Sequence, residues 1–258
     1  MNCVVKSIYF CPVKSLSFQS LKSCNIKKNL GILNDRVFAF SRGLNLNKAK
    51  FIEKNPKERK LNNLLILKNS PVLNKYNFIY DGSTLTLANN QKELISISTS
   101  NSNENSLLTN KLLELEKSLQ GPIFLLKNND FPFYDTSSSN KIFNSMSLVN
   151  INSIKDFEKK INDKVEFQRF RGNFYVDGVE PWEERKWINK IVKINNISFK
   201  VEKNIPRCVT INLKPKTDNI NFNLLKSLKE NFNHFDMGVY LTAIEDGKID
   251  VGSKVELN

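Results

Sequence analysis

The chain has 258 residues, 40% of them hydrophobic, so it can bury one large core or two modest ones without cross-links. Its net charge of +13 would suit a nucleic acid or an anionic membrane, but the lysines are spread over the whole chain and form no basic stripe with interleaved aromatic residues. We therefore expect neither nucleic acid nor membrane as a partner. No stretch approaches the ~20 apolar residues of a transmembrane helix, and the first residues lack the apolar run of a signal peptide.

The first half of the chain is predicted to be mainly strands. A β-rich run from Val4 to Phe10 ends before a proline, and the residues from Asn77 to Leu87 hold Asp81-Gly82, a common hairpin turn. Leucines at helical spacing predict a helix from about Asn105, stopped by Gly121-Pro122.

The polar stretch from Asp130 to Asn144 is typical of a loop and divides the chain into halves. From its position we predict two domains, residues 1–125 and residues 126–258.

In the second half, Ile154, Phe157 and Ile161 predict a helix capped by Asn152 or Ser153. A hairpin is expected around Asn195-Asn196, because asparagine tolerates the positive φ of a tight turn.

Nearer the end of the chain, leucines at 224, 225 and 228 predict a further helix. A strand from Val239 to Ile244, a turn at Asp246-Gly247 and a last strand near Lys254 to Leu257 complete the prediction. The expected fold class is mainly β with a few helices (α+β), and the many short strands favour barrels or sandwiches.

The cysteines are Cys3, Cys11, Cys24 and Cys208. They include no C-x-x-C pair and no even set of short spacings, so the sequence predicts neither a zinc site nor a disulfide framework. We expect reduced thiols and a cytoplasmic protein.

Two N-terminal fragments could bind an anion. Lys14 and Ser15 of P-V-K-S lie where a strand ends and could hold a phosphate, although an ordinary loop lysine explains them as well. Asp35-Arg36 is, taken alone, most simply a surface ion pair.

Two C-terminal fragments carry similar alternatives. In R-F-R-G-N, residues 169–173, strand alternation would place both arginines on one face, facing either an anion or the carboxylates of Glu183 and Glu184. The thiol of Cys208, beside Arg207, is either a small buried apolar group or a soft thiolate suited to a metal.

The order of these fragments resembles the MOSC-domain family, named for the molybdenum cofactor sulfurase C-terminal domain. P-V-K-S followed by D-R resembles its N-terminal β-barrel domain. R-F-R-G-N, V-D-G at 176–178, P-W-E-E at 181–184, R-C and the closing G-V-Y and V-G resemble the MOSC domain itself. The resemblance covers about residue 1 to residue 257, and the chain is similar to the branch that contains the mitochondrial amidoxime-reducing component and the bacterial hydroxylaminopurine-detoxifying proteins.

The resemblance implies a β-barrel-like MOSC domain beside a smaller N-terminal β-barrel domain, with a molybdenum-molybdopterin cofactor between them. Cys208 would ligate molybdenum and act as the catalytic residue. The phosphate and pterin would be held by Lys14, Ser15, Arg36, Arg171, Asn173 and their neighbour Arg207. Trp182, Glu183, Glu184 and Trp187 would be structural. Gly172 departs from the proline that is usual between the arginine and the asparagine.

The implied activity is the two-electron reduction of a small N-hydroxylated substrate, with electrons from a separate donor protein because no iron–sulfur cysteine run is present. The alternatives are sulfur transfer through Cys208, without the pyridoxal phosphate-dependent aminotransferase domain of a full sulfurase, and a cofactor carrier without turnover. His234 is the sole histidine, so a histidine-based catalytic triad is not expected.

Overall fold

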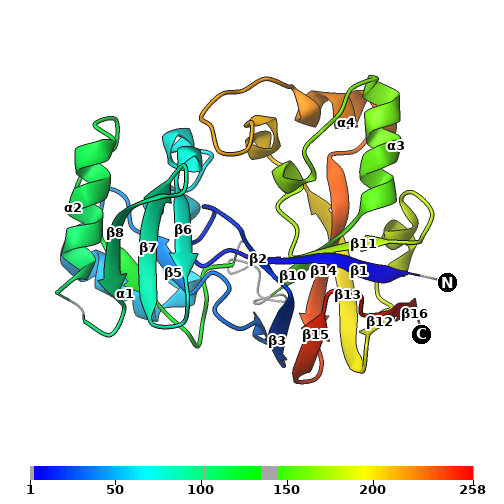
Figure 1. Cartoon of the computed structure of the whole chain (residues 1–258), viewed down its shortest axis with the longest axis horizontal. Helices are drawn as coiled ribbons and strands as arrows, with labels where there is room; N and C mark the ends of the chain where they lie inside the picture. Colours follow the sequence, from blue (N-terminus) through cyan, green and yellow to red (C-terminus); the bar gives the residue numbers. More distant parts are fainter. Residues whose placement is uncertain (1–2, 102, 135–144, 258) are drawn as a thin grey trace.

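The computed structural model describes residues 3–101, 103–134 and 145–257, which form an α+β fold (Figure 1). Four α-helices and several β-sheets lie in these ranges, so the predicted class, mainly β with a few helices, is confirmed. None of the described helices combines the length and the apolar character that crossing a membrane requires.

The largest sheet has eight strands in the order β16-β12-β13-β14-β10-β11-β1-β2. All its pairs are antiparallel except β10 with β11. Its strands are β1 (Val4–Phe10), β2 (Gln19–Leu21), β10 (Met146–Asn150), β11 (Phe174–Asp177), β12 (Ile191–Ile194), β13 (Ile197–Pro206), β14 (Asp236–Ala243) and β16 (Val255–Leu257).

This sheet is not a closed barrel within the described residues, so the expected barrel is only approximate. An isolated bridge joins Val4 to Lys254, and Val5 exchanges backbone hydrogen bonds with Gly252 and Ser253. The sheet does not close further along β1, because β2 pairs with the free edge of β1 from Ile8 onward.

A second group of elements forms the other lobe in Figure 1. Helix α2 lies beside the three-stranded sheet β6-β7-β8, and β5 pairs with β9. The bounds are β5 (Phe38–Phe40), α1 (Leu46–Lys54), β6 (Asn77–Tyr80), β7 (Thr84–Asn89), β8 (Lys92–Ser98), α2 (Asn105–Leu115) and β9 (Leu125–Lys127), with 3₁₀ helices at Pro56–Glu58, Leu61–Asn63 and Pro71–Lys75.

The two halves of the chain interlock through strand pairing. The first strands, β1 and β2, belong to the eight-stranded sheet, and β3 (Ser23–Lys27) pairs with β4 (Gly31–Ile32) and with β15 (Gly247–Asp250). Helices α3 (Ile151–Ile161) and α4 (Leu224–Phe232) pack together at one end of the sheet (Figure 1). The boundary between residues 125 and 126 stays a prediction, and most of the predicted loop, 135–144, lies outside the described residues.

The structure confirms the two predicted hairpin turns, in which the residues of the turn itself set the backbone conformation. Asp81 accepts hydrogen bonds from the backbone N–H groups of Ser83 and Thr84 in the β6–β7 turn, and Asn195 has φ 55° in the β12–β13 turn. Two helix limits differ from the prediction. Helix α2 ends at Leu115 rather than near Gly121, and the side chain that caps α3 belongs to Asn150.

The predicted structural role of Glu184 agrees with its surroundings. Its buried carboxylate accepts hydrogen bonds from Ser153 Oγ at 2.8 and 2.9 Å and from Asn150 Nδ2 at 3.1 Å. Burial raises the pKa of this carboxyl, although the two hydrogen-bond donors oppose the shift. The neighbouring Trp187 is 1% exposed in the core.

Replacing Glu184 with glutamine should therefore change how stability depends on pH. A carboxyl whose pKa is raised by folding stabilises the protein below its unfolded pKa, and this contribution is lost as pH rises through the folded value. The wild type should lose stability relative to Glu184→Gln as pH rises above 4.5, measured by urea unfolding. The half-buried neighbour provides the control, Glu183→Gln, and an equal pH dependence in both variants would contradict the prediction.

Candidate functional site

Cys208 lies in a turn at the end of the longest strand of the large sheet. Strand β13 ends at Pro206, and a 3₁₀ helix, Val209–Asn212, follows the cysteine. The thiol is exposed, whereas the other three cysteines are buried, and all four are free. Its Sγ lies 3.0 Å from the hydroxyl oxygen of Thr210. The interpretation of Cys208 as a buried apolar residue is therefore wrong.

The Cys208 thiol opens into a cavity of about 280 Å³, which we call the Cys208 cavity. Five cationic side chains line it, and the described lining contains no carboxylate. These cations come from both halves of the chain and are Arg36, Lys68, Arg169, Arg171 and Arg207. Ser15, Ser147, Thr210 and Tyr240 add hydroxyl groups. Two of these cations pair with carboxylates that lie outside the lining, Arg36 with Asp35 and Arg169 with Glu166. The lining itself still presents cations without an acidic side chain and favours an anionic ligand, because clustered cations raise the local concentration of negative charge.

Arg171 connects the C-terminal half of the chain to the N-terminal half. Its Nη2 donates a hydrogen bond to the carbonyl oxygen of Leu16, and its guanidinium lies 4.6 Å from the centre of the Phe18 ring. Arg36 lies 5.7 Å from the same ring. Beneath them, burial raises the pKa of the Cys11 thiol although both arginines oppose the shift. Phe18 therefore helps to position both arginines.

The strand predicted for residues 169–173 was wrong. The structure has a 3₁₀ helix from Phe167 to Phe170, and Arg171 follows with a left-handed φ of 50°. The hydroxyl of Tyr175 stabilises this turn, because it accepts from the N–H of Gly172 and donates to the carbonyl of Phe167. The two arginines consequently point in different directions.

Gly172 also has a steric role in this turn. A Cβ at this position would lie 2.9 Å from a methyl group of Val149 and 3.1 Å from the ring of Tyr175. A proline here would in addition lack the N–H that bonds to Tyr175. The departure from the family's usual proline therefore matches a local packing requirement.

Arg169 is a structural residue of the cavity wall. Its side chain is fully buried and donates to the carboxylate of Glu166 at 2.7 Å, the carbonyl of Asn212 at 3.1 Å and the side chain of Asn221 at 2.7 Å. The alternative of pairing with Glu183 or Glu184 does not hold for Arg169, because its carboxylate partner is Glu166 and Glu183 pairs with Lys186. Arg169 instead supports the segment that follows Cys208.

Arg207 supports the same wall from the other side. Its Nη1 donates to the carbonyl of Phe170 at 2.6 Å, and its Nε donates to the carbonyl of Met237 at 2.8 Å. The side chain thereby ties the turn before Arg171 to strand β14. Its geometry suits positioning more than direct contact with a ligand.

Asp35 and Arg36 form an ion pair whose carboxylate is buried and whose guanidinium reaches the cavity, rather than the surface pair considered from the sequence. The Asp35 side chain is fully buried and bonds to Arg36, to the N–H of Cys11 at 2.7 Å and to Asn173 Nδ2 at 3.1 Å. Desolvation is the largest influence on its carboxyl pKa and raises it, whereas Arg36 opposes the shift. Asp35 fixes the direction of Arg36.

Asn173 lies behind the cavity rather than in it. Its side-chain oxygen accepts from the N–H and the hydroxyl of Ser147, both at 3.0 Å, and its Nδ2 donates to the carbonyl of Tyr9 at 3.0 Å as well as to Asp35. These four hydrogen bonds occupy both N–H donors and both oxygen lone pairs of the Asn173 amide. The side chain of Lys14 is likewise buried, 2% exposed, and is not among the lining residues. Both residues therefore support the site from within.

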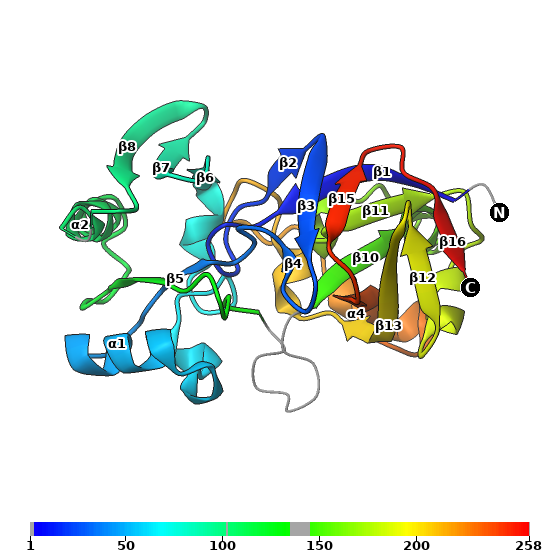
Figure 2. The same ribbon diagram turned by 90° about the horizontal axis from the view of Figure 1, so that it is seen from below.

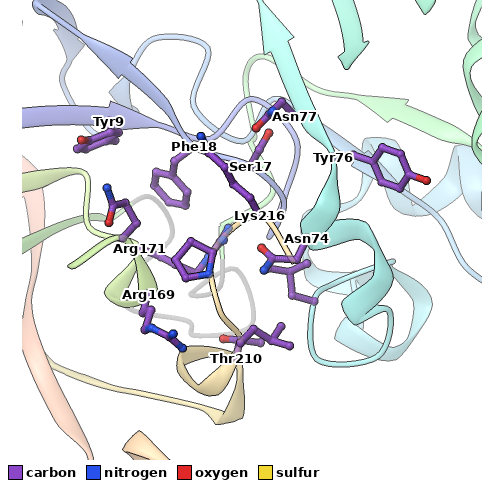
Figure 3. A pocket seen from close by; sticks show the side chains of 14 residues that line it. Tyr9, Ser17, Phe18, Asn74, Tyr76, Asn77, Arg169, Arg171, Thr210 and Lys216 are labelled. Carbon is purple, nitrogen blue, oxygen red and sulfur yellow. The ribbon is translucent and has the colours of Figure 1, made fainter. Parts of the chain in front are cut away.

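A second cavity of about 110 Å³ adjoins the first, and Arg169, Arg171 and Thr210 line both (Figure 3). Phe18 and Arg171 lie on one side of it and Asn74 on the other, whereas the hydroxyl of Tyr76 points away. Asn74 donates to the carbonyls of Lys214 and Thr217, which joins the segment after Cys208 to the N-terminal half.

Some residues of the site had no signal in the sequence. Phe18, Thr210 and Lys68 belong to no motif, and Asp35, taken with Arg36 alone, was expected in a surface ion pair. Only Thr210 could have been suspected, because it lies two residues after the cysteine. His234 lines neither cavity, and its ring packs against Trp182 and Phe232.

The chain is similar to known proteins in sequence family and in fold. The family described as "MOSC domain" matches residues 139–256. No curated protein matches the chain in sequence. Among solved structures, YuaD from Bacillus subtilis is similar over 100% of this chain and 96% of its own, with 9% identity and a TM-score of 0.46. YiiM from Geobacillus stearothermophilus is similar over 44% of this chain and 53% of its own, with 14% identity and a TM-score of 0.36.

Proposed function

Because residues 139–256 are a MOSC domain, we propose that the chain binds a molybdenum-molybdopterin cofactor and, with it, reduces small N-hydroxylated compounds. The observation that carries the proposal is the exposed thiol of Cys208 in a cavity lined by five cations and no described carboxylate. We place this activity in the cytoplasm.

The chemistry of the lining fits this cofactor. A thiolate is a soft ligand suited to molybdenum, and guanidinium groups match the fork of phosphate oxygens. The ring of Phe18 and the hydroxyls of Ser15 and Tyr240 supply a flat face and hydrogen-bonding groups for a heterocycle. The two adjoining cavities together reach the lower end of the range of ligand pockets, ~300–1,000 Å³.

The residues of the proposed cofactor site then have distinct roles. Cys208 would be the metal ligand, held in place by its contact with Thr210, and Arg36 and Arg171 would bind the anionic groups of the cofactor. Lys14 and Asn173 would act as positioning residues behind the site. When bound, the cofactor supplies the two-electron redox centre that no side chain of the cavity offers.

The proposed reaction breaks the N–O bond of the substrate. The substrate takes up two electrons and two protons, and its oxygen leaves as water. The electrons come from a separate donor protein. The cavity hydroxyls of Tyr240 and Thr210 can carry protons to the leaving oxygen.

One observation favours a second candidate function. Cys208 is the only exposed cysteine of the four. Its thiolate could attack the outer sulfur of a donor protein's persulfide, which breaks the donor's S–S bond and releases the donor thiolate, and the Cys208 persulfide could then pass that sulfur on and regenerate its own thiolate. A cofactor carrier without turnover would use the same site. Both alternatives keep the cationic cavity but need no electron donor.

The proposal is tested on protein purified from cells that make the cofactor. We expect molybdenum and pterin to copurify with the chain, and an aromatic amidoxime to be reduced when reduced methyl viologen supplies electrons. Molybdenum without turnover would identify a carrier. Absence of molybdenum would count against the reductase and the carrier alike, and a cyanide-labile sulfur on Cys208 would then support sulfur transfer.

Arg171→Lys should lower the pterin content of the purified protein although the charge is kept. Lysine cannot reproduce the planar fork that contacts the Leu16 carbonyl and faces Phe18. Pterin per chain is measured by fluorescence after release, and Lys48→Ala, outside both cavities, is the control. Unchanged pterin in Arg171→Lys would remove this arginine from the binding site.

A further inference from the structure

A separate groove of about 880 Å³ is lined by residues of helix α1 and of the turn from β3 to β4, the elements labelled α1, β3 and β4 in Figure 2. It shares no lining residue with the two cavities of the candidate site. Its described lining consists of Lys27, Lys28, Asn29, Leu30, Phe51, Lys54, Asn55, Pro56, Lys57, Glu58, Asp130 and Phe131. We call it the lysine–phenylalanine groove.

Two phenyl rings of this groove are exposed to solvent. Phe51 is 46% exposed and Phe131 is 52% exposed, and Leu30 and Pro56 extend the apolar part of the lining. Scattered single apolar residues on a surface need no explanation, but two aromatic rings in one concavity are typical of a binding surface.

The groove is built rigidly around Phe131. Arg59, 5% exposed, donates to the carbonyls of Ile52 and Glu53 in α1 and to those of Phe131 and Pro132. Burial lowers the pKa of Arg59 to about 10, so it stays charged at neutral pH. This clamp holds the backbone of Phe131 against α1 while the ring stays exposed, which lowers the entropic cost of binding a partner.

A second clamp acts on the same segment. Asn128 accepts from the N–H of Phe131 at 2.8 Å and donates to the carbonyl of Glu53 at 2.7 Å. The exposed ring is therefore part of a fixed surface and does not sit on a loose loop.

The positive charge around the groove favours a negatively charged ligand. Four exposed lysines, Lys27, Lys28, Lys54 and Lys57, surround the rings, against two acidic residues, Glu58 and Asp130. We propose that the groove docks an acidic protein segment, whose apolar side chain enters between Phe51 and Phe131 while its carboxylates face the lysines. This proposal does not depend on the cofactor.

The shape and the mixed charges favour a protein segment over other anionic macromolecules. A flat bilayer surface cannot fill a concavity whose aromatic rings form part of the lining. The regular phosphates of a nucleic acid would be repelled by Glu58 and Asp130, which a protein segment can meet with backbone N–H groups.

The test measures fluorescence anisotropy of a labelled acidic peptide of about twelve residues with one central leucine, titrated with the full chain. We expect saturable binding that weakens about tenfold in Phe131→Ser and in the double variant Lys54→Glu/Lys57→Glu. The matched controls are Phe235→Ser, an exposed ring outside the groove, and Lys6→Glu/Lys92→Glu, which makes the same charge change elsewhere. Both should bind as the wild type does.

Several results would overturn the proposal. One is the absence of saturable binding up to about 1 mM peptide. Another is equal weakening by the groove and control charge variants, which would mean that net charge alone attracts the peptide. Unchanged binding after the leucine is replaced by serine would remove the role of the rings. Tighter binding of phosphatidylserine vesicles or of oligothymidine than of the peptide, lost in Phe131→Ser, would assign the groove to a membrane or to a nucleic acid.

Discussion

Cys208→Ala is expected to abolish reduction of N-hydroxylated compounds and to lower the molybdenum content of the purified protein, while the fold stays intact. Alanine offers no donor atom, so the proposed metal ligand is lost outright. The thiol is exposed and contacts the hydroxyl of Thr210, so its removal leaves no core cavity. We expect a stability cost of about 1 kcal/mol or less.

Three measurements on one preparation separate the possibilities for Cys208. Melting temperature reports the fold, pterin content reports cofactor retention, and turnover reports the reaction. Pterin should remain in part, because Arg36 and Arg171 do not need the sulfur to bind anionic groups. Normal turnover in Cys208→Ala would exclude this residue as the ligand, and a much lower melting temperature would show that its role is structural.

Cys24→Ala is the matched control for this experiment. Cys24 is a buried cysteine in β3 that lines neither cavity of the candidate site. Its replacement should cost some stability but leave turnover per folded molecule unchanged, as should replacement of Cys3 or Cys11. Loss of turnover in Cys24→Ala would mean that cysteine substitution disturbs the site indirectly.

Gly238→Ala should destabilise the protein more than any surface substitution, by about 4 kcal/mol or more. Gly238 lies in β14 with φ +80°, and a Cβ there would lie 2.4 Å from the carbonyl oxygen of Leu148 and 3.0 Å from a methyl group of Val149. The carbonyl belongs to β10, which is paired on both sides in the centre of the sheet and cannot move away. Either β10 and β14 must separate or the alanine must strain its own backbone.

Gly43→Ala isolates the steric part of this effect. Gly43 has φ +65°, but a Cβ there would meet nothing within 4 Å. Its replacement should cost only the left-handed backbone penalty of about 1–2 kcal/mol. Free energies of unfolding from urea titrations give the difference, and similar losses in both variants would show that strand β10 can accommodate the added methyl group.

Elements that depend on neighbouring residues could be predicted from the sequence. The turns at Asp81-Gly82 and at Asn195 form as expected, because the side chains that stabilise them lie within three residues. The end of α2 could not be predicted in the same way. The carboxylate of Glu116 accepts from the hydroxyl of Tyr76 at 2.7 Å and pairs with Lys75 at 2.6 Å, and these residues are about forty positions away in the chain.

The candidate site, too, has features that the sequence predicted and features that it did not. The motifs identified Ser15, Arg36, Arg171, Arg207 and Cys208, and the structure brings all five to one cavity. The strand alternation expected in R-F-R-G-N is wrong, because Tyr175 closes a 3₁₀ turn there from outside the motif. The inward positions of Lys14 and Asn173 had no local signal.

The sequence by itself determined the mainly β class, the tight turns, the free thiols and which fragments would gather around Cys208. Each of these follows from residue type, from short-range hydrogen bonding or from a family pattern. Only the tertiary structure decided that Asp35 is buried, that the Phe18 ring contacts the guanidinium groups of two arginines and that Phe51 and Phe131 share a groove with lysines. These features join segments far apart in the chain, and burial and charge pairing depend on what the fold places around a side chain rather than on its neighbours in sequence.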